Sequence, residues 1–394
     1  MSDRNPAGQS LFAVWAIIGC QLSVLNHQTT VAEETPVFRA TVRIGETLYV
    51  SAQGSRNPQT GEQPADIESA TTQTMLNIDR ELSRAGFSFS DVVSVQVWLT
   101  DLEKYHEMNS AYRSFFRQQF PTRTTLGVTA LPDGSMVQIA MVAVKGPKQV
   151  IRPAGTTASN LPFSPGILAG DTLYLSGHVG INPESGKLIE GDIGDHVVQT
   201  LKNIQDVLKA ADMDLSHVIS AYLYMKNVEE FAAASNAYLT MITEEPRPAR
   251  LPMGVAKLPL DSPVEITMIA SRKPRRAVIG EGQPPSGSYS RGLLSNNVMH
   301  LAGVFRREGT VQHQVSEGIE WLTAILKAGE MQLKDVVEVR VYLSDIGDHA
   351  ALTAACRQYF SDSGPTLAIT AVPQLPARST IMLGLVAARR PVSE

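Results

Sequence analysis

The chain of 394 residues has little cysteine, few aromatic residues and no excess of positive charge. Its two cysteines lie far apart in the sequence, which excludes a disulfide framework. The eight histidines show no H-E-x-x-H spacing and no cluster with cysteine, so we expect no structural metal. The net charge is −5, no more than two Lys or Arg residues stand side by side, and platforms of mixed aromatic and basic residues are missing, which argues against a nucleic-acid surface.

The longest apolar run near the N-terminus, residues 10–19, has the length of a signal peptide and is too short to span a bilayer as a helix. Arg4 precedes the run, and Cys20 follows it in an Ile-Ile-Gly-Cys sequence that resembles a bacterial lipoprotein cleavage box. We therefore predict an exported protein, periplasmic or anchored to a membrane through lipidated Cys20, with residues 21–36 as a polar tether. The alternative is a cytoplasmic protein whose N-terminal extension contains a chance apolar run.

Comparison of the sequence with itself reveals three copies of one unit. Residues 74–101, 200–227 and 318–345 align without a gap, and each segment has a helix with apolar residues at helical spacing, a short turn and a β-branched strand. Apolar residues make up 43% of the chain and charged residues 19%, which is typical of a folded globular protein. The length is too great for one ordinary core and fits several domains.

Each copy predicts the element order β-β-α-β-α-β-β, which is an α+β fold with its helices on one face of a sheet. We place a leader and tether at 1–36 and units at 37–147, 155–273 and 280–392, separated by proline-rich joints. The uncovered faces of three such sheets can cover one another if the units close within one chain. We therefore predict an intrachain pseudo-trimer and a monomeric protein.

The closing segments, "FPTRTTLGVTALPDGSMVQIAMVAV" and "RPARLPMGVAKLPLDSPVEITMIAS", and the opening segment "PFSPGILAGDTLYLSGHVGINPESG" resemble the RidA family of reactive intermediate deaminases. The resemblance covers about residues 37–392. It implies a chorismate-mutase-like unit that assembles as a trimer, with ligand sites in the clefts between neighbours. It also implies hydrolysis of short 2-imino acids, or their enamine tautomers, to 2-keto acids and ammonia, without a cofactor or metal.

The second copy matches the family's site most completely. Arg250 stands at the family's arginine position, where a guanidinium would bind the substrate carboxylate through two parallel hydrogen bonds. Glu265, fifteen residues on, stands where the family has the glutamate that positions water. Gly177 matches the family's backbone-contact glycine and Phe163 the position of a tyrosine in the cleft wall. We therefore predict that Arg250 and Glu265 form the catalytic pair.

The first copy has Arg123 in register with Arg250, but Gln138 takes the place of the glutamate. A glutamine can orient a water by hydrogen bonding but cannot readily accept its proton. Ala52 replaces the family's glycine and Phe38 fills the tyrosine position. We expect Arg123 and Gln138 to bind a carboxylate and to contribute less to turnover.

The third copy contains Arg378 in a Pro-Ala-Arg sequence like that of Arg250. Alignment of Val372-Pro373 with the Leu-Pro pair of the first copy places Gly364 at the arginine position, with a turn three residues longer that contains Arg378. Met382 then falls at the glutamate position. We therefore expect Arg378 to be an ordinary turn residue and the third copy to lack a working site of its own.

Tyr289 and Gly303 of the third copy nevertheless match the family's tyrosine and glycine, so this copy is predicted to contribute a wall to a neighbouring site. Cys356 falls on the inner face of a helix, where a small core residue is the expected role rather than a nucleophile.

The leading interpretation is an imine deaminase that acts on a small carboxylate. The alternatives are a protein that binds a small carboxylate or amino acid without turnover, favoured by the loss of glutamate in two copies, and a scaffold. Endoribonuclease activity, also described for the family, finds little support in the acidic charge balance.

Overall fold

The computed structural model describes residues 37–117, 119–153, 160–360 and 364–390, all within one compact unit, Pro36–Glu394. The predicted leader, its lipidation site Cys20 and the tether lie outside the described residues, so their assignment stays a prediction. Among the helices of the described ranges, none combines the length and the apolar character that crossing a bilayer requires.

The first unit has the predicted order of elements. Its sheet has the strand order β1-β2-β5-β3-β4, in which β3 and β4 are parallel and the other neighbours antiparallel. The elements are β1 (Thr41–Ile44), β2 (Thr47–Gln53), α1 (Ile67–Arg84), β3 (Val92–Leu99), α2 (Tyr105–Arg113), β4 (Thr122–Gly127) and β5 (Val137–Val144).

The second and third units repeat this arrangement and add edge strands. Both proline-rich joints form a strand, β6 (Lys148–Ile151) and β12 (Arg275–Val278), which pair with the first hairpin of the unit that follows. The second unit continues with β7 (Gly166–Ala169), β8 (Thr172–Leu175), α3 (Ile193–Lys209), β9 (Val218–Met225), α4 (Phe231–Met241), β10 (Ala249–Gly254) and β11 (Val264–Ser271). The third has β13 (Gly292–Ser295), β14 (Val298–Leu301), β15 (Val304–Arg306), α5 (Val311–Ala328), β16 (Val336–Leu343), α6 (His349–Cys356), β17 (Thr366–Ala371) and β18 (Ile381–Ala388).

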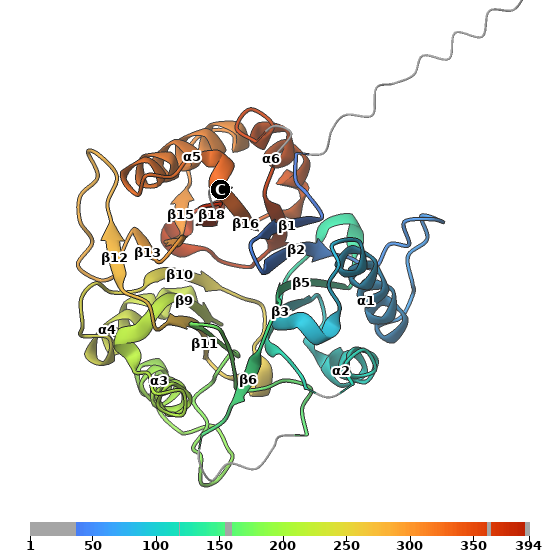
Figure 1. Cartoon of the computed structure of the whole chain (residues 1–394), viewed down its shortest axis with the longest axis horizontal. Helices are drawn as coiled ribbons and strands as arrows, with labels where there is room; N and C mark the ends of the chain where they lie inside the picture. Colours follow the sequence, from blue (N-terminus) through green and yellow to red (C-terminus); the bar gives the residue numbers. More distant parts are fainter. Residues whose placement is uncertain (1–36, 118, 154–159, 361–363, 391–394) are drawn as a thin grey trace, which may run out of the picture. The chain divides into compact units, whose positions relative to one another are not determined.

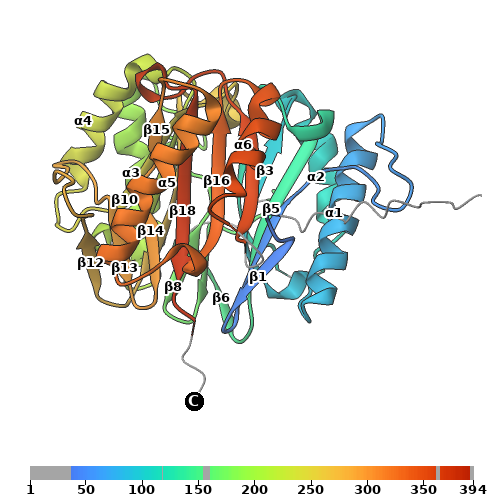
Figure 2. The ribbon, with the colours of Figure 1, turned by 90° about the horizontal axis from the view of Figure 1, so that it is seen from above.

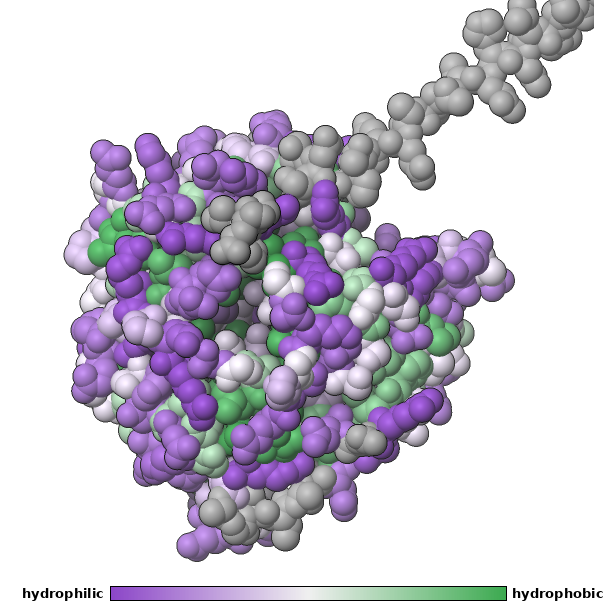
Figure 3. Space-filling model, viewed as in Figure 1, coloured by the Kyte–Doolittle hydropathy of each residue, from purple (hydrophilic) through white to green (hydrophobic). Residues whose placement is uncertain are grey.

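The helices of each unit cover one face of its sheet, on the outside of the three sheets (Figure 1). Because side chains alternate between the faces of a strand, one set of residues on β11 packs against the helices. Val264, Ile266 and Met268 form this set and lie in a core with Leu201 and Ile204 of α3. The residues between them point to the opposite, inner face. On the surface in Figure 3, hydrophilic side chains cover most of the area and apolar patches are smaller.

The inner faces of the three sheets cover one another. One central apolar cluster contains Trp98, Tyr224 and Tyr342, which occupy equivalent positions in β3, β9 and β16. Main-chain hydrogen bonds join each pair of units: Gly127 N–H to Lys257 O at 2.9 Å, Gly254 N–H to Gln374 O at 3.0 Å, and Ala371 N–H to Ala130 O at 3.0 Å. The predicted intrachain pseudo-trimer is confirmed, and Figure 2 shows β3 and β16 from above.

The segment before the first hairpin of each unit is hydrogen-bonded to the residue directly before the parallel edge strand of the preceding unit. Ser164 N–H donates to Pro121 O at 2.9 Å, and Ser290 N–H donates to Pro248 O at 3.2 Å. The equivalent bond joins the first unit to the third: Arg39 N–H of the first unit donates to Pro365 O of the third at 3.0 Å.

The predicted register of the third copy is wrong by three residues. Pro365 is the equivalent of Pro121, and β17 pairs Leu367 with Val339 just as β4 pairs Arg123 with Val95. Leu367, not Gly364, therefore stands at the arginine position.

The error arises because "AVPQLPAR" contains two aliphatic-Pro pairs, three residues apart. The turn begins at the second pair, Leu375-Pro376, and is no longer than the other two. Gly364 packs against the main chain of Val37, and a Cβ there would be 1.7 Å from Val37 O. The expectation that Arg378 lies in a turn is confirmed.

This turn stores backbone strain in the third unit. Ala377 and Arg378 have φ of 55° and 54°, in the left-handed region, where the first unit has Asp133 and Gly134. A residue with a side chain in this conformation costs roughly 1–2 kcal/mol, whereas glycine adopts it freely.

We therefore expect Arg378→Gly to raise the free energy of unfolding by about 0.5–1 kcal/mol, after allowance for glycine's greater freedom in the unfolded chain. The measurement is denaturant unfolding at equilibrium. Gly134→Ala, the matched control, should lower the stability by a similar amount. A destabilised Arg378→Gly protein would show that the arginine makes contacts that outweigh the strain.

Candidate active site

Arg123 lies on the edge strand β4, on the face covered by helices, and is only 3% exposed. Its guanidinium carbon lies 4.9 Å from the centre of the Tyr112 ring and 5.4 Å from the rings of Tyr105 and Phe163. Nη2 donates to the Tyr105 hydroxyl at 2.9 Å, and Nη1 finds no hydrogen-bond partner in the described part of the chain. Phe163 belongs to the second unit, so this aromatic cage spans two units.

The second unit contributes the carboxyl of Glu265 to the interface at which Arg123 lies. It lies on β11 between Val264 and Ile266, which face the helices, so its side chain points to the inner face. The carboxyl is buried beside Gly177, where an added Cβ would lie 1.7 Å from Oε1 and would force the carboxyl to move. Oε2 has no hydrogen-bond partner among the described residues.

The environment of Glu265 favours its protonated form. Burial raises the pKa of the carboxyl to about 8, and the Arg123 guanidinium opposes the shift only in part. A carboxyl group with such a pKa can accept or donate a proton near neutral pH.

Arg123 and Glu265 line one cleft between the first and second units, with a volume of about 580 Å³. Phe163 and Gly177 line it too. The main chain of β4 fixes this geometry, because Arg123 N–H donates to Ser176 Oγ at 2.9 Å and Gly177 N–H donates to Arg123 O at 3.1 Å. The cleft thus combines a buried guanidinium, a buried carboxyl and an apolar wall.

The predicted pairing of Arg250 with Glu265 is wrong. Arg250 points to the helix-covered face of its sheet, where it lies 5.4 Å and 5.2 Å from the ring centres of Phe231 and Tyr238. Glu265 points to the inner face of the same sheet. β9 separates their strands and pairs Arg250 with Ala221 and Glu265 with Tyr224. These registers place their Cα atoms roughly 14 Å apart.

Arg250 is buried at the interface between the second and third units, at the position equivalent to Arg123. Tyr289 lies 5.7 Å from its guanidinium carbon, and Gly303 N–H donates to Arg250 O at 3.1 Å. Tyr289 and Gly303 of the third copy therefore lie beside Arg250 of the second, the placement that a shared wall requires, and their role in a site stays a prediction. The residue at the glutamate position is Met382, whose sulfur would lie 3.0 Å from a Cβ on Gly303. Nε and Nη1 of Arg250 lack hydrogen-bond partners among the described residues.

The third interface, between the third and first units, brings Gln138 opposite Leu367 rather than Arg123. A hollow of about 330 Å³ there is lined by Phe38, Ala52, Gln138 and Leu367. The predicted pairing of Arg123 with Gln138 is thus also wrong. With leucine at the arginine position and glutamine at the glutamate position, this interface has neither half of the catalytic pair.

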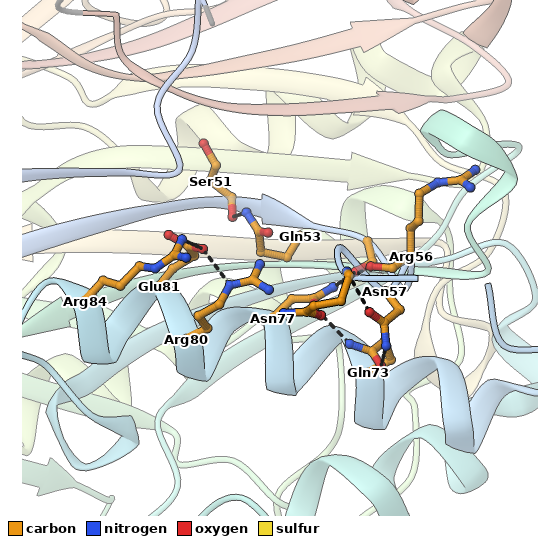
Figure 4. Close-up of polar contacts among 11 residues, drawn as sticks. Ser51, Gln53, Arg56, Asn57, Gln73, Asn77, Arg80, Glu81 and Arg84 are labelled. Carbon is orange, nitrogen blue, oxygen red and sulfur yellow. Dashed lines mark hydrogen bonds and ion pairs between the residues drawn. The ribbon is translucent and has the colours of Figure 1, made fainter. Parts of the chain in front are cut away.

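In the first and second units, an asparagine of the first helix donates hydrogen bonds to the loop that follows the second strand of the hairpin. In the first unit, Asn77 Nδ2 donates to Gly54 O and Arg56 O, each at 3.0 Å, and Gln73 donates to Asn77 Oδ1 at 2.9 Å (Figure 4). In the second unit, Asn203 Nδ2 donates in the same way to the carbonyls that follow Gly177, those of residues 179 and 181, at 3.0 and 2.8 Å. The helix therefore positions the wall of the cleft that contains Glu265.

Sequence reasoning missed three residues of the cleft. Tyr105 opens α2 seven residues before Tyr112, so both stand on one face of the helix, a spacing that could have identified it. Leu161 and Leu260 line the cleft and are 37% and 63% exposed. No local pattern in the sequence marks either leucine as part of a site.

Cys356 is 1% exposed and packs in the apolar core of the third unit. Burial raises the pKa of its thiol to about 12, so the thiol is protonated at neutral pH. The prediction of a core residue is confirmed.

Comparison with known proteins gives matches to all three units. The family model described as endoribonuclease L-PSP matches residues 31–145, 155–272 and 281–388. The 2-iminobutanoate/2-iminopropanoate deaminases of goat and human are 34% and 32% identical over 127 residues, which is 32% of this chain and 92% of each relative. A RutC family protein of Pyrococcus horikoshii is 37% identical over 112 residues, 28% of this chain and 88% of the relative. A solved structure from the Rid family, YyfA of Yersinia pestis, is 31% identical, covers 32% of this chain and 99% of its own, and has a TM-score of 0.31.

Proposed function

The chain belongs to the endoribonuclease L-PSP family, which includes the RidA-type deaminases, and from this premise we propose that it hydrolyses 2-imino acids to 2-keto acids and ammonia. The reaction takes place in the cleft between the first and second units. The observation that carries the proposal is that Arg123 and Glu265, contributed by different units, line one cleft.

Arg123 binds the substrate carboxylate. A guanidinium presents parallel N–H donors that match a carboxylate, and its aromatic cage excludes water from the contact. The bound carboxylate would satisfy Nη1, which the described part of the chain leaves without a partner. This fixes the imine carbon on the side of the cleft that Glu265 faces.

Glu265 in its ionised form removes a proton from water as the water oxygen bonds to the imine carbon. The imine nitrogen, protonated in the reactive iminium form, receives the electron pair of the C=N bond, which gives a carbinolamine. Return of the proton from Glu265 to nitrogen converts the amine into a leaving group. As the C–N bond breaks and ammonia leaves, the hydroxyl oxygen gives its proton to the Glu265 carboxylate, which leaves the 2-keto acid and a protonated Glu265 that then releases its proton to water or ammonia. A carboxyl with a pKa of about 8 suits both steps.

The substrate side chain is expected to be large and apolar. Leu260 has φ of 58° and is 63% exposed at the cleft, although a left-handed leucine costs roughly 1–2 kcal/mol. The left-handed conformation is shared by the equivalent turn residues Asp133 and Ala377, so the distinctive feature of Leu260 is an apolar side chain exposed at the cleft, which a contact with ligand would cover. Leu161 adds a second exposed apolar side chain to the cleft.

We expect Leu260→Asp, which introduces the residue that the first unit has at this turn (Asp133), to lower kcat/KM for the imines of leucine and phenylalanine about tenfold. The value for 2-iminopropanoate should change less than about threefold, because a methyl group does not reach the leucine. The assay generates each imine in situ and follows its decay. Leu76→Asp on α1, also at an exposed leucine, is the control. An equal loss for large and small substrates would contradict this role.

A second candidate function is binding without turnover, at Arg250. Its buried guanidinium also lacks partners for Nε and Nη1 among the described residues, and Met382 cannot accept a proton. The Arg250 guanidinium would bind a carboxylate such as that of the keto-acid product. Titration calorimetry with 2-oxobutanoate should then give two sites, of which Arg250→Ala removes one.

A further inference from the structure

A separate cavity of about 160 Å³, here called the central cavity, lies where the inner faces of the three sheets meet. Three equivalent residues on the second strands of the hairpins line it, namely Tyr49 on β2, Tyr174 on β8 and His300 on β14. None of Arg123, Glu265 and Arg250 is among its lining residues.

The three units differ at the positions that face this cavity. The third residue of the long central strand is Ser94 in the first unit and Glu338 in the third, and both line the cavity. The fifth residue is Gln96 in the first unit and Arg340 in the third. A trimer of identical chains would repeat each residue three times, whereas this fused chain carries a single charged pair.

Arg340 and Glu338 form an ion pair inside the protein. Nε of Arg340 donates to Oε1 of Glu338 at 3.0 Å, and its guanidinium carbon lies 4.8 Å from the centre of the Tyr222 ring. The side chains are only 14% and 10% exposed. Desolvation of a buried ion pair often exceeds the attraction it gains, and a well-packed apolar pair is commonly as stable. A contribution to stability therefore does not explain why this buried pair is present.

His300 provides a second observation that points to a ligand. It is 6% exposed and lines the cavity, and its Nδ1 has no hydrogen-bond partner among the described residues. Burial, and to a lesser degree the Arg340 guanidinium, lower the pKa of His300 to about 4, so the ring is neutral at neutral pH. A neutral imidazole offers one donor and one acceptor.

The charges of the cavity lining balance. Besides the buried pair, the lining includes Lys273 and Asp171, which form an ion pair at 3.0 Å and are each about half exposed. Because the lining is neutral overall, an ion of either sign would add an uncompensated charge. A molecule that carries both charges would meet both.

We propose that the central cavity binds a small zwitterion of the α-amino acid type, with its carboxylate toward Arg340 and its ammonium toward Glu338. The volume is close to that of cavities that bind benzene, so it suits a ligand of roughly six non-hydrogen atoms, as in alanine. This site is independent of the proposed deaminase activity.

The test is titration calorimetry of the purified full-length protein with alanine, and with acetate and methylammonium as probes of each half of the ligand. The key variant is Glu338→Ser combined with Arg340→Gln, because the first unit has serine and glutamine at these positions in the same fold. A second variant, Arg123→Ala with Arg250→Ala, removes both of these guanidinium groups and leaves the central cavity intact.

We expect saturable binding of alanine in the parent protein and in the Arg123→Ala/Arg250→Ala protein, at least tenfold weaker binding of acetate and methylammonium, and loss of binding in the Glu338→Ser/Arg340→Gln protein. His300→Tyr, the residue of the other two units, should weaken binding at least threefold. Absence of saturable binding in the parent, or undiminished binding in the Glu338→Ser/Arg340→Gln protein, would overturn the proposal. Loss of binding in the Arg123→Ala/Arg250→Ala protein alone would assign alanine to these arginines and would equally refute it.

Discussion

Arg123→Ala is expected to lower kcat/KM for a 2-imino acid by about 30- to 1000-fold, whereas Arg250→Ala should lower it by less than about threefold. The first range corresponds to about 2–4 kcal/mol, the usual effect of removing a charge-assisted contact made in the transition state. Arg123 lines the cleft that contains Glu265, and Arg250 faces Met382 across another interface. The two arginines therefore form a matched pair of variants in one chain.

Further variants separate charge from geometry. Arg123→Lys should restore only part of the activity, because an ammonium lacks the planar fork of the guanidinium. Arg378→Ala should leave the activity unchanged, since Arg378 lies in an exposed turn. If Arg250→Ala abolished the activity and Arg123→Ala preserved it, the assignment of the site would be wrong.

Glu265→Gln is expected to abolish turnover and to change how stability depends on pH. The folded-state pKa of Glu265, about 8, lies above the ordinary value of 4.5, so the folded protein holds this proton more tightly than the unfolded chain does. The protonated group therefore contributes stability that is fully present below pH 4.5 and is lost as the pH rises through about 8. The loss is on the order of a few kcal/mol.

Glutamine has no such proton, and Gln138 occupies the equivalent buried position in the first unit, so the variant is compatible with the fold. Its free energy of unfolding should fall less than that of the parent between pH 5 and pH 9, and at pH 9 the variant should be the more stable protein. Parallel pH profiles of unfolding would contradict the raised pKa. In the parent, kcat/KM should rise with pH toward about 8, because the ionised carboxyl accepts the proton of water.

The fold followed from the sequence because its signals are repeated. Three copies of the same alternation between helical and strand periodicity predicted the α+β units, and uncovered sheet faces predicted their closure. The joints were harder to interpret: β6 and β12 are edge strands whose pairing depends on the hairpin that follows, and isolated four-residue segments carry little periodic signal.

The site was harder to predict than the fold, because its halves come from different copies. An arginine and a glutamate fifteen residues apart in one copy appear to form a pair in the sequence, yet the turn between them places Arg250 and Glu265 on opposite faces of one sheet. Pairing of the first copy's Arg123 with the second copy's Glu265 depends on the order of units around the assembly. In the third copy, two neighbouring aliphatic-Pro pairs left the register undecided until main-chain pairing placed Leu367 opposite Val339.

The most direct test of the central claim, that one site is built from Arg123 of the first unit and Glu265 of the second, is a crystal structure with bound 2-oxobutanoate. The account predicts a carboxylate on the Arg123 guanidinium, with the keto carbon facing the Glu265 carboxyl. A structure in which Glu265 contacts a ligand held by Arg250, or in which the ligand leaves the Arg123 cleft empty, would contradict it.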